Sequence, residues 1–144
     1  MANGVLHFHS YQGLESDSNG NLSASNISQS SSTMSNYVHS GWQQFAVTLQ
    51  TFTGSIGVDN SNFGSVIIFY HNSTPVSSHI IAQIPPTGVS DGVQNTFLGG
   101  SHMSSGHMRR QYHGEIGIAA MYSDVLSQEQ IAENYNRMRG RYNV

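Results

Sequence analysis

Two glutamates have a spacing that could support acid–base chemistry. Glu129 and Glu133 lie four residues apart, so a helix would carry both on one face. The flanking sequence predicts that this is the polar face of a short surface helix, where carboxylates are solvated. Four aspartates are isolated in turn sequences, where the side chain caps the turn: Asp17, Asp59, Asp91 and Asp124. We therefore expect no catalytic residues, and the sequence does not predict an enzyme.

Potential metal ligands occur in two loops. Asp59, Asn60 and Asn62 supply hard oxygen donors of the type that calcium prefers. Residues 102–108, HMSSGHM, contain two His-Met steps that could ligate a soft copper ion. The alternative in both places is a polar loop, because the first has a single carboxylate and the second has no helix to fix the imidazoles. We expect that folding requires no metal and no other cofactor.

The composition narrows the classes of partner. The 144 residues fit one domain, only 9% are charged, lysine is absent and the formal net charge is −3. The five arginines form no basic stripe, which argues against nucleic-acid binding. No stretch approaches the roughly 20 apolar residues of a membrane span, and the start MANGVLHFHS shows no signal-peptide pattern. The absence of cysteine excludes disulfides and thiolate metal sites.

The elements that would position any site are clearest near the end of the chain. After Gly114, apolar residues recur at every second position and predict a half-buried strand: Ile116, Ile118, Ala120 and Tyr122. Ser127 and Gln130 then form a capping box, with Leu126 and Ile131 at the hydrophobic-staple positions. A helix is predicted over residues 128–139. Its last turn is basic, and Gly140 is the expected left-handed C-cap.

The apolar stripe of this helix is narrow. Ile131, Tyr135 and Met138 are spaced four and three residues apart, which suits packing of one seam on a sheet. Before the helix, residues 5–11 and 21–28 predict two N-terminal strands, and residues 28–35 predict a surface loop.

The middle of the chain has the strongest strand signals. Residues 42–49 predict a core strand with Phe45, Val47 and Leu49 on one face and Trp42 at its start. Residues 66–71 form a continuous apolar run, typical of a strand buried on both faces. Asn72-Ser73-Thr74-Pro75 predicts a hairpin turn that leads into a strand over residues 76–84. Leu98-Gly99-Gly100 ends a short predicted strand.

Four of these motifs, in this order, resemble a known family. They are WQQFAVT at residues 42–48, YHNS at residues 70–73, LGG at residues 98–100, and the closing pattern from Tyr112 to Asn136. The chain resembles the laminin-G-like domains of the concanavalin A-like jelly-roll superfamily, of the kind found in phage and bacterial surface proteins. It departs from the family at Ser73, where a hairpin glycine is usual, in a more apolar closing strand, and in having only 41 residues before the tryptophan strand.

The resemblance implies an all-β fold, an antiparallel β-sandwich of the jelly-roll type with one short C-terminal helix. The residues expected to support it are Trp42, Phe45, Val47, Tyr70, Gly99, Gly114, Ile116, Tyr122, Leu126, Ser127, Ile131 and Tyr135. Six residues are expected to lie in or against one core: Trp42, Phe45, Val47, Ile68, Tyr122 and Ile131. The glucanases of this superfamily place two carboxylates four residues apart on one strand, and no predicted strand of this chain has such a pair.

Two function classes remain open. The first is a non-catalytic structural protein of a virion or other extracellular assembly, such as a capsid decoration or tail component. The second is a carbohydrate-binding, lectin-like module, with Tyr11, Tyr37 and Tyr112 as candidate ligand-stacking residues. Trp42 could likewise be a sugar platform, but its place at the head of a strand favours a core role.

The expected partners are other protein subunits, with glycans as an alternative and with no nucleic acid or membrane. The apolar strands lack the charged residues that usually protect sheet edges, so we expect an oligomer. Residues 5–11 are the predicted strand for exchange between subunits. The alternative is that this N-terminal segment folds back and pairs within its own chain.

Overall fold

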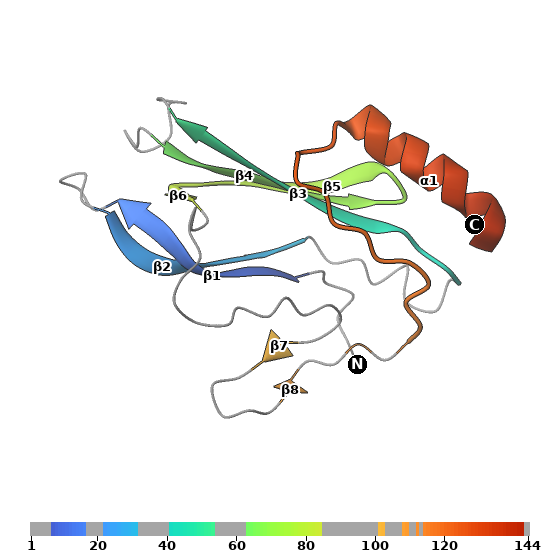
Figure 1. Ribbon diagram of the computed structural model, residues 1–144, viewed down its shortest axis with the longest axis horizontal. Helices are drawn as coiled ribbons and strands as arrows, with labels where there is room; N and C mark the ends of the chain where they lie inside the picture. Colours follow the sequence, from blue (N-terminus) through green and yellow to red (C-terminus); the bar gives the residue numbers. More distant parts are fainter. Residues whose placement is uncertain are drawn as a thin grey trace. The chain divides into compact units, whose positions relative to one another are not determined.

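The computed structural model describes residues 7–16, 22–31, 41–53, 63–84, 101–102, 108–109, 112 and 114–142 (Figure 1). Tertiary contacts divide the chain into two units, one formed by Met1–Pro86 with Ser123–Val144 and the other by Thr87–Tyr122. Within the described residues, the first unit holds two three-stranded antiparallel sheets and one helix, and the second holds a two-stranded ribbon. The expectation of a single domain stays a prediction.

The better-packed sheet consists of β3 (Phe45–Thr53), β4 (Phe63–His71) and β5 (Thr74–Ile81), in the order β3-β4-β5. Both pairings are antiparallel, and β4 lies at the centre. The apolar run at residues 66–71 therefore lies in a strand, as predicted, but the predicted burial of both faces is met only in part. Its two faces are buried unequally, because alternate residues from Ser65 to His71 are buried whereas Val66 and Ile68 are half-buried.

The core lies on the face of this sheet that carries Ile67 and Phe69, both of which are fully buried. The partly buried residues that pack against them are Phe8, Val47, Leu49, Val76 and Ile81. Removing a side chain of this size from water contributes roughly 1.5–3 kcal/mol. The His79 ring meets Phe69 edge-on at a centroid distance of 5.9 Å, so an aromatic contact adds to this packing.

The expected core is partly wrong at its margins. Phe45 lies on the same face as Val47 but at the end of an edge strand, and 43% of it is exposed. Tyr122 is 54% exposed. Ile68 is half-buried and lies on the opposite face of β4 from Ile67 and Phe69, so it is not part of their core cluster. Sequence alternation assigned Phe45 correctly to the core face, but it did not show that the neighbouring strand ends there.

The other sheet consists of β1 (His7–Ser16), β2 (Leu22–Ser30) and β6 (Gln83–Ile84), in the order β2-β1-β6. β1 pairs antiparallel with β2 on one side and with β6 on the other. The N-terminal segment therefore folds back onto its own chain, which is the alternative to strand exchange. Residues 28–30 belong to β2, so the predicted loop at residues 28–35 begins too early.

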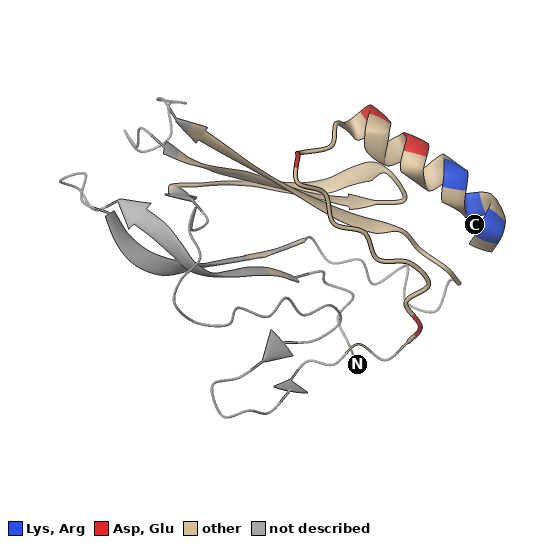
Figure 2. Ribbon diagram, in the orientation of Figure 1, with Lys and Arg blue, Asp and Glu red and all other residues tan. Residues whose placement is uncertain are grey.

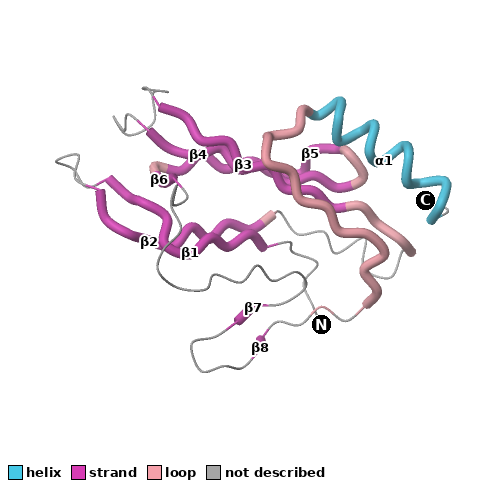
Figure 3. Tube along the Cα trace, viewed as in Figure 1, coloured by secondary structure: helices cyan, strands magenta, loops and turns pink. Residues whose placement is uncertain are grey.

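A hairpin connects β4 to β5 (Figure 3), and its turn consists of residues 72 and 73. Asn72 and Ser73 have φ angles of 45° and 67°, the left-handed pair of a type I′ turn. The sequence predicted a turn here, and Ser73 occupies a position that glycine would adopt with less strain. The strand predicted over residues 76–84 is interrupted at Ala82, where the chain passes from β5 to β6 and so changes sheet.

The helix α1 runs from Gln128 to Tyr142 and begins as predicted. Ser127 N donates to Gln130 Oε1 at 2.8 Å, and Gln130 N donates to Ser127 Oγ at 3.3 Å, which completes the capping box. Ile131 is buried. Leu126, Tyr135 and Met138 are half-buried, so the predicted apolar stripe is the covered face of the helix.

The predicted end of the helix is wrong. Gly140 lies inside α1 and does not have the positive φ of a left-handed cap. Among the described glycines, the positive φ is that of Gly41. The helix continues for two further residues, and the Tyr142 ring lies 4.8 Å from the Trp42 ring. This contact across the chain holds the last turn in place, and a tertiary contact of this kind overrides the local preference of glycine for a C-cap.

The second unit contains β7 (Ser101–His102) and β8 (Met108–Arg109), which pair antiparallel. No residue from 114 to 121 belongs to a strand, and all of them are exposed, so the predicted closing strand is absent from the structure of the single chain (Figure 3). A period-two pattern shows that a segment suits a ladder, but a strand forms only where a partner strand supplies the hydrogen bonds. The short strand predicted to end at Gly100 lies outside the described residues.

Candidate functional site

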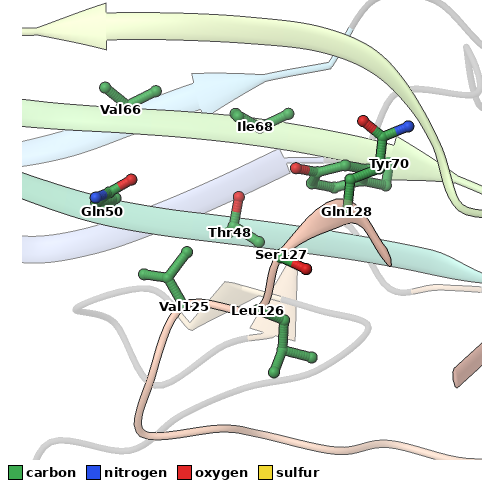
Figure 4. A pocket seen from close by; sticks show the side chains of 9 residues that line it. All are labelled: Thr48, Gln50, Val66, Ile68, Tyr70, Val125, Leu126, Ser127 and Gln128. Carbon is green, nitrogen blue, oxygen red and sulfur yellow. The ribbon is translucent and has the colours of Figure 1, made fainter. Parts of the chain in front are cut away.

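A shallow pocket of about 350 Å³ lies on the face of the β3-β4-β5 sheet that is turned away from the core (Figure 4). Its lining residues come from β3, β4 and the turn that leads into α1: Thr48, Gln50, Val66, Ile68, Tyr70, Val125, Leu126, Ser127 and Gln128. A volume of this size is at the lower end of the range for small-molecule sites.

The antiparallel register brings the strand residues of the pocket together. Thr48 is opposite Ile68, and Gln50 is opposite Val66, so polar residues of β3 alternate with the apolar residues of the core face. β3 was predicted from the apolar residues of its core face, Val47 and Leu49, and no site was predicted for the polar residues between them. The sequence nevertheless contained the information, because Thr48 and Gln50 alternate with the apolar residues of β3. In a strand that is buried on one face, such polar side chains lie together on the other face.

The turn into α1 forms the remaining wall. Ser127 already has its hydroxyl engaged, since Ser127 Oγ donates to Glu129 Oε2 at 2.8 Å and accepts from Gln130 N. Leu126 is half-buried at the staple position, and Val125 is 45% exposed. The wall is therefore built by local helix-capping interactions.

The pocket offers neutral hydrogen-bonding groups beside apolar ones. Thr48, Gln50, Gln128 and Tyr70 supply hydroxyl and amide groups, and no carboxylate, imidazole or cationic side chain is among the nine lining residues. Such a surface can bind an uncharged ligand with hydroxyl groups or contact another protein.

A second polar cluster secures the β4–β5 hairpin to the residues before β3. Asn72 Nδ2 donates to Gln43 Oε1 at 2.9 Å, Gln44 N donates to Asn72 Oδ1 at 2.9 Å, and Asn72 N donates to Gln44 O at 3.0 Å. His71 Nε2 lies 2.7 Å from Gln43 Oε1 and donates to it when that nitrogen carries the proton. The cluster fixes the hairpin in its left-handed conformation.

His71 is the buried titratable group of this cluster. Desolvation lowers the pKa of its imidazole below the ordinary value, which favours the neutral ring. The Phe45 ring stacks obliquely on it at 5.3 Å. A neutral imidazole held by the Gln43 amide and the Phe45 ring stabilises the hairpin.

The two glutamates with helical spacing are engaged separately. Glu129 accepts from Ser127 Oγ, and this hydrogen bond, together with a backbone hydrogen bond, lowers the pKa of its carboxyl. Glu133 pairs with Arg137 at 2.6 Å on the exposed side of the helix. Figure 2 shows acidic residues near the start of α1 and basic residues near its end, an arrangement that complements the helix dipole.

Several of the other sequence candidates lie outside the described residues. They are Asp59, Asn60, Asn62 and Tyr37. Tyr11 belongs to β1. Within the described residues, no group of three or more His, Asp or Glu side chains could hold a metal ion.

The remaining aromatic candidates differ in their surroundings. Tyr112 is 58% exposed, and its ring lies against Gly114, where an added Cβ would come within 2.7 Å of it. Trp42 is half-buried, and its ring lies 4.8 Å from the Tyr142 ring at an interplanar angle of 45°. Trp42 therefore joins the end of α1 to the start of β3, in keeping with a structural role.

A further surface feature is a run of exposed apolar side chains. The apolar segment, residues 114–121, contains Ile116 at 51%, Ile118 at 47% and Met121 at 80% exposure, with Glu115 as its one charged residue. Contiguous exposed apolar surface marks sites of protein interaction more often than isolated apolar residues do.

Comparison with known proteins gave no match. No family model matches the chain, no curated protein is significantly similar to it, and no solved structure matches its fold. Among the helices of the part of the chain that the structure describes, none combines the length and apolar character that crossing a membrane requires.

Proposed function

We propose that the chain is a non-catalytic structural subunit of a virion or other extracellular assembly, built on a laminin-G-like β-sandwich. The observation that carries the proposal is the exposed apolar segment. Its isoleucines and methionine are exposed in the single chain, and few charges interrupt them. A subunit buries such residues against a neighbour, and this burial supplies the main driving force for association.

Two features support the sandwich. Phe8 of β1 packs against the core cluster of the β3-β4-β5 sheet, although it belongs to the other sheet. The chain also passes directly from β5 to β6 and so from one sheet to the other. Both are expected when two antiparallel sheets share one apolar layer.

Purified particles from the source of the protein test the proposal. Quantitative mass spectrometry should find the chain at a constant ratio to the major structural protein in successive purification steps, and high salt should not remove it, because apolar contacts are not screened. Loss of the chain in step with soluble contaminants would contradict the proposal.

Carbohydrate binding is the second candidate, and the neutral pocket favours it. Thr48, Gln50 and Gln128 are suited to sugar hydroxyls, and Ile68 and Val66 can cover an apolar sugar face. A glycan array tests this function, with Gln50→Ala as the pocket variant. Ser78→Ala, an exposed position on β5, is the matched control. Specific binding that Gln50→Ala abolishes and Ser78→Ala retains would support the lectin function over the structural one.

A further inference from the structure

The apolar segment has the sequence of a strand without being one in the single chain. Ile116, Ile118 and Ala120 alternate on one side of GEIGIAAM, and the segment contains no proline. None of its residues is in a strand, and all of them are exposed. The segment therefore has the alternation of a strand but no strand to pair with, and a partner strand from elsewhere would supply the missing hydrogen bonds.

β3 supplies a free edge of matching length. It pairs with β4 on one side, and no described strand pairs with its other side. Its nine residues, FAVTLQTFT, include no proline and no charged side chain, so every residue has a backbone N–H and nothing on the edge repels an incoming strand. The apolar segment has eight residues.

The core face of β3 is also incomplete. Phe45 is 43% exposed, and Val47 and Leu49 are half-buried, although all three lie on the face that carries the buried core. A strand added beside β3 would place alternate apolar residues next to these three. The opposite edge is less suitable, because β5 contains Pro75, which has no backbone N–H to donate.

We infer that the apolar segment of one copy adds as a strand to the free edge of β3 in a second copy of this chain. The inference rests on the proposed structural function and names its partner and its contact. Main-chain hydrogen bonds hold the added strand, and the contacts of Ile116 and Ile118 with the core face fix its register. The donor is thus the segment near the C-terminal helix, whereas the N-terminal strand β1 stays paired within its own chain.

Disulfide trapping between two differently tagged copies tests the contact, because the natural chain has no cysteine. One copy carries Ile118→Cys, and the other carries Phe45→Cys, Val47→Cys or Leu49→Cys, so that the scan covers three registers. A disulfide forms only where the Cα atoms come within about 4.4–6.8 Å. We expect one of the three pairs to form the mixed dimer at least tenfold faster than the control pair with Ser78→Cys on β5.

A proline variant tests the strand by a different route. Ala119→Pro removes one N–H donor and blocks pairing, but it leaves the single chain folded, because Ala119 is in no strand there. Ala119→Ser is the matched control. In sedimentation experiments at micromolar concentration, Ala119→Pro should weaken self-association at least tenfold, and Ala119→Ser should behave as the natural chain does. Thermal unfolding measured by circular dichroism checks that both remain folded.

Three results would overturn the inference. They are a natural chain that stays a 15.7 kDa monomer at these concentrations, equal self-association of the two Ala119 variants, and trapping at Ser78 in preference to β3. Particle incorporation separates this failure from failure of the proposed function. A chain that enters particles at a constant ratio but shows no trapping at β3 remains a structural subunit with a different contact.

Discussion

Two glycine-to-alanine substitutions should change stability in opposite directions. Gly140→Ala adds a methyl group in the last turn of α1, where nothing lies within 4 Å of the new Cβ. Gly64→Ala adds the same group inside β4, where the new Cβ comes within 2.5 Å of the Phe52 ring and closer still to the Ile81 carbonyl oxygen. The chemical change is the same, so the difference reports only on the surroundings.

The magnitudes follow from these surroundings. Alanine is favoured over glycine in a helix interior by about 0.8–1.0 kcal/mol. Gly140 is two residues from the end of α1, where the helix frays, so we expect Gly140→Ala to stabilise the chain by about 0.5 kcal/mol. Overpacking in a core costs about 1–3 kcal/mol. The reduced freedom of the unfolded chain offsets about 0.5 kcal/mol of this, which leaves Gly64→Ala about 0.5–2.5 kcal/mol less stable.

Urea denaturation followed by Trp42 fluorescence and by circular dichroism measures both values. A shift of 1 kcal/mol corresponds to roughly 2–4 °C in melting temperature for a chain of this size. Loss of about 1 kcal/mol in Gly140→Ala would show that Gly140 is the left-handed cap that its sequence context suggests, and it would refute the assignment of the last turn. An unchanged stability in Gly64→Ala would refute the close approach of Phe52.

Three further outcomes are expected. Phe69→Ala should cost about 3–5 kcal/mol because Phe69 is fully buried, whereas Phe45→Ala should cost less than about 1.5 kcal/mol, and equal losses in urea denaturation would contradict the assigned core. Ser127→Ala should cost about 1 kcal/mol at neutral pH through loss of the cap. Because the pKa of Glu129 is lowered in the folded chain, its hydrogen bond with Ser127 stabilises the fold at pH values above the ordinary carboxyl pKa. This stabilisation is lost as the pH falls through the lowered pKa. The difference in melting temperature between the natural chain and Ser127→Ala should therefore narrow in acid. Ser73→Gly should stabilise the hairpin by up to about 1 kcal/mol, and a loss of stability would show that the left-handed turn is not strained.

Features governed by neighbouring residues were predictable from the sequence. Ser127 and Gln130 are three residues apart, so their reciprocal hydrogen bonds depend on local geometry alone, and the helix starts where they place it. The turn at Asn72 and Ser73 is likewise a two-residue event. The apolar run through Ile67 and Phe69 indicated a buried strand, because few other environments accommodate uninterrupted apolar residues, whereas the central place of this strand in its sheet came from the tertiary structure.

Features governed by residues far apart in the chain were decided only by the tertiary structure. Trp42 meets Tyr142 a hundred residues away, and this contact extends α1 past Gly140. The strand order leaves β3 at an edge, so Phe45 is exposed although its alternation is that of a core residue. Residues 114–121 show most clearly what the sequence alone could not predict. Alternation fixes which side chains share a face, but a ladder needs a partner, and the choice of partner depends on which backbone groups the rest of the fold leaves unpaired.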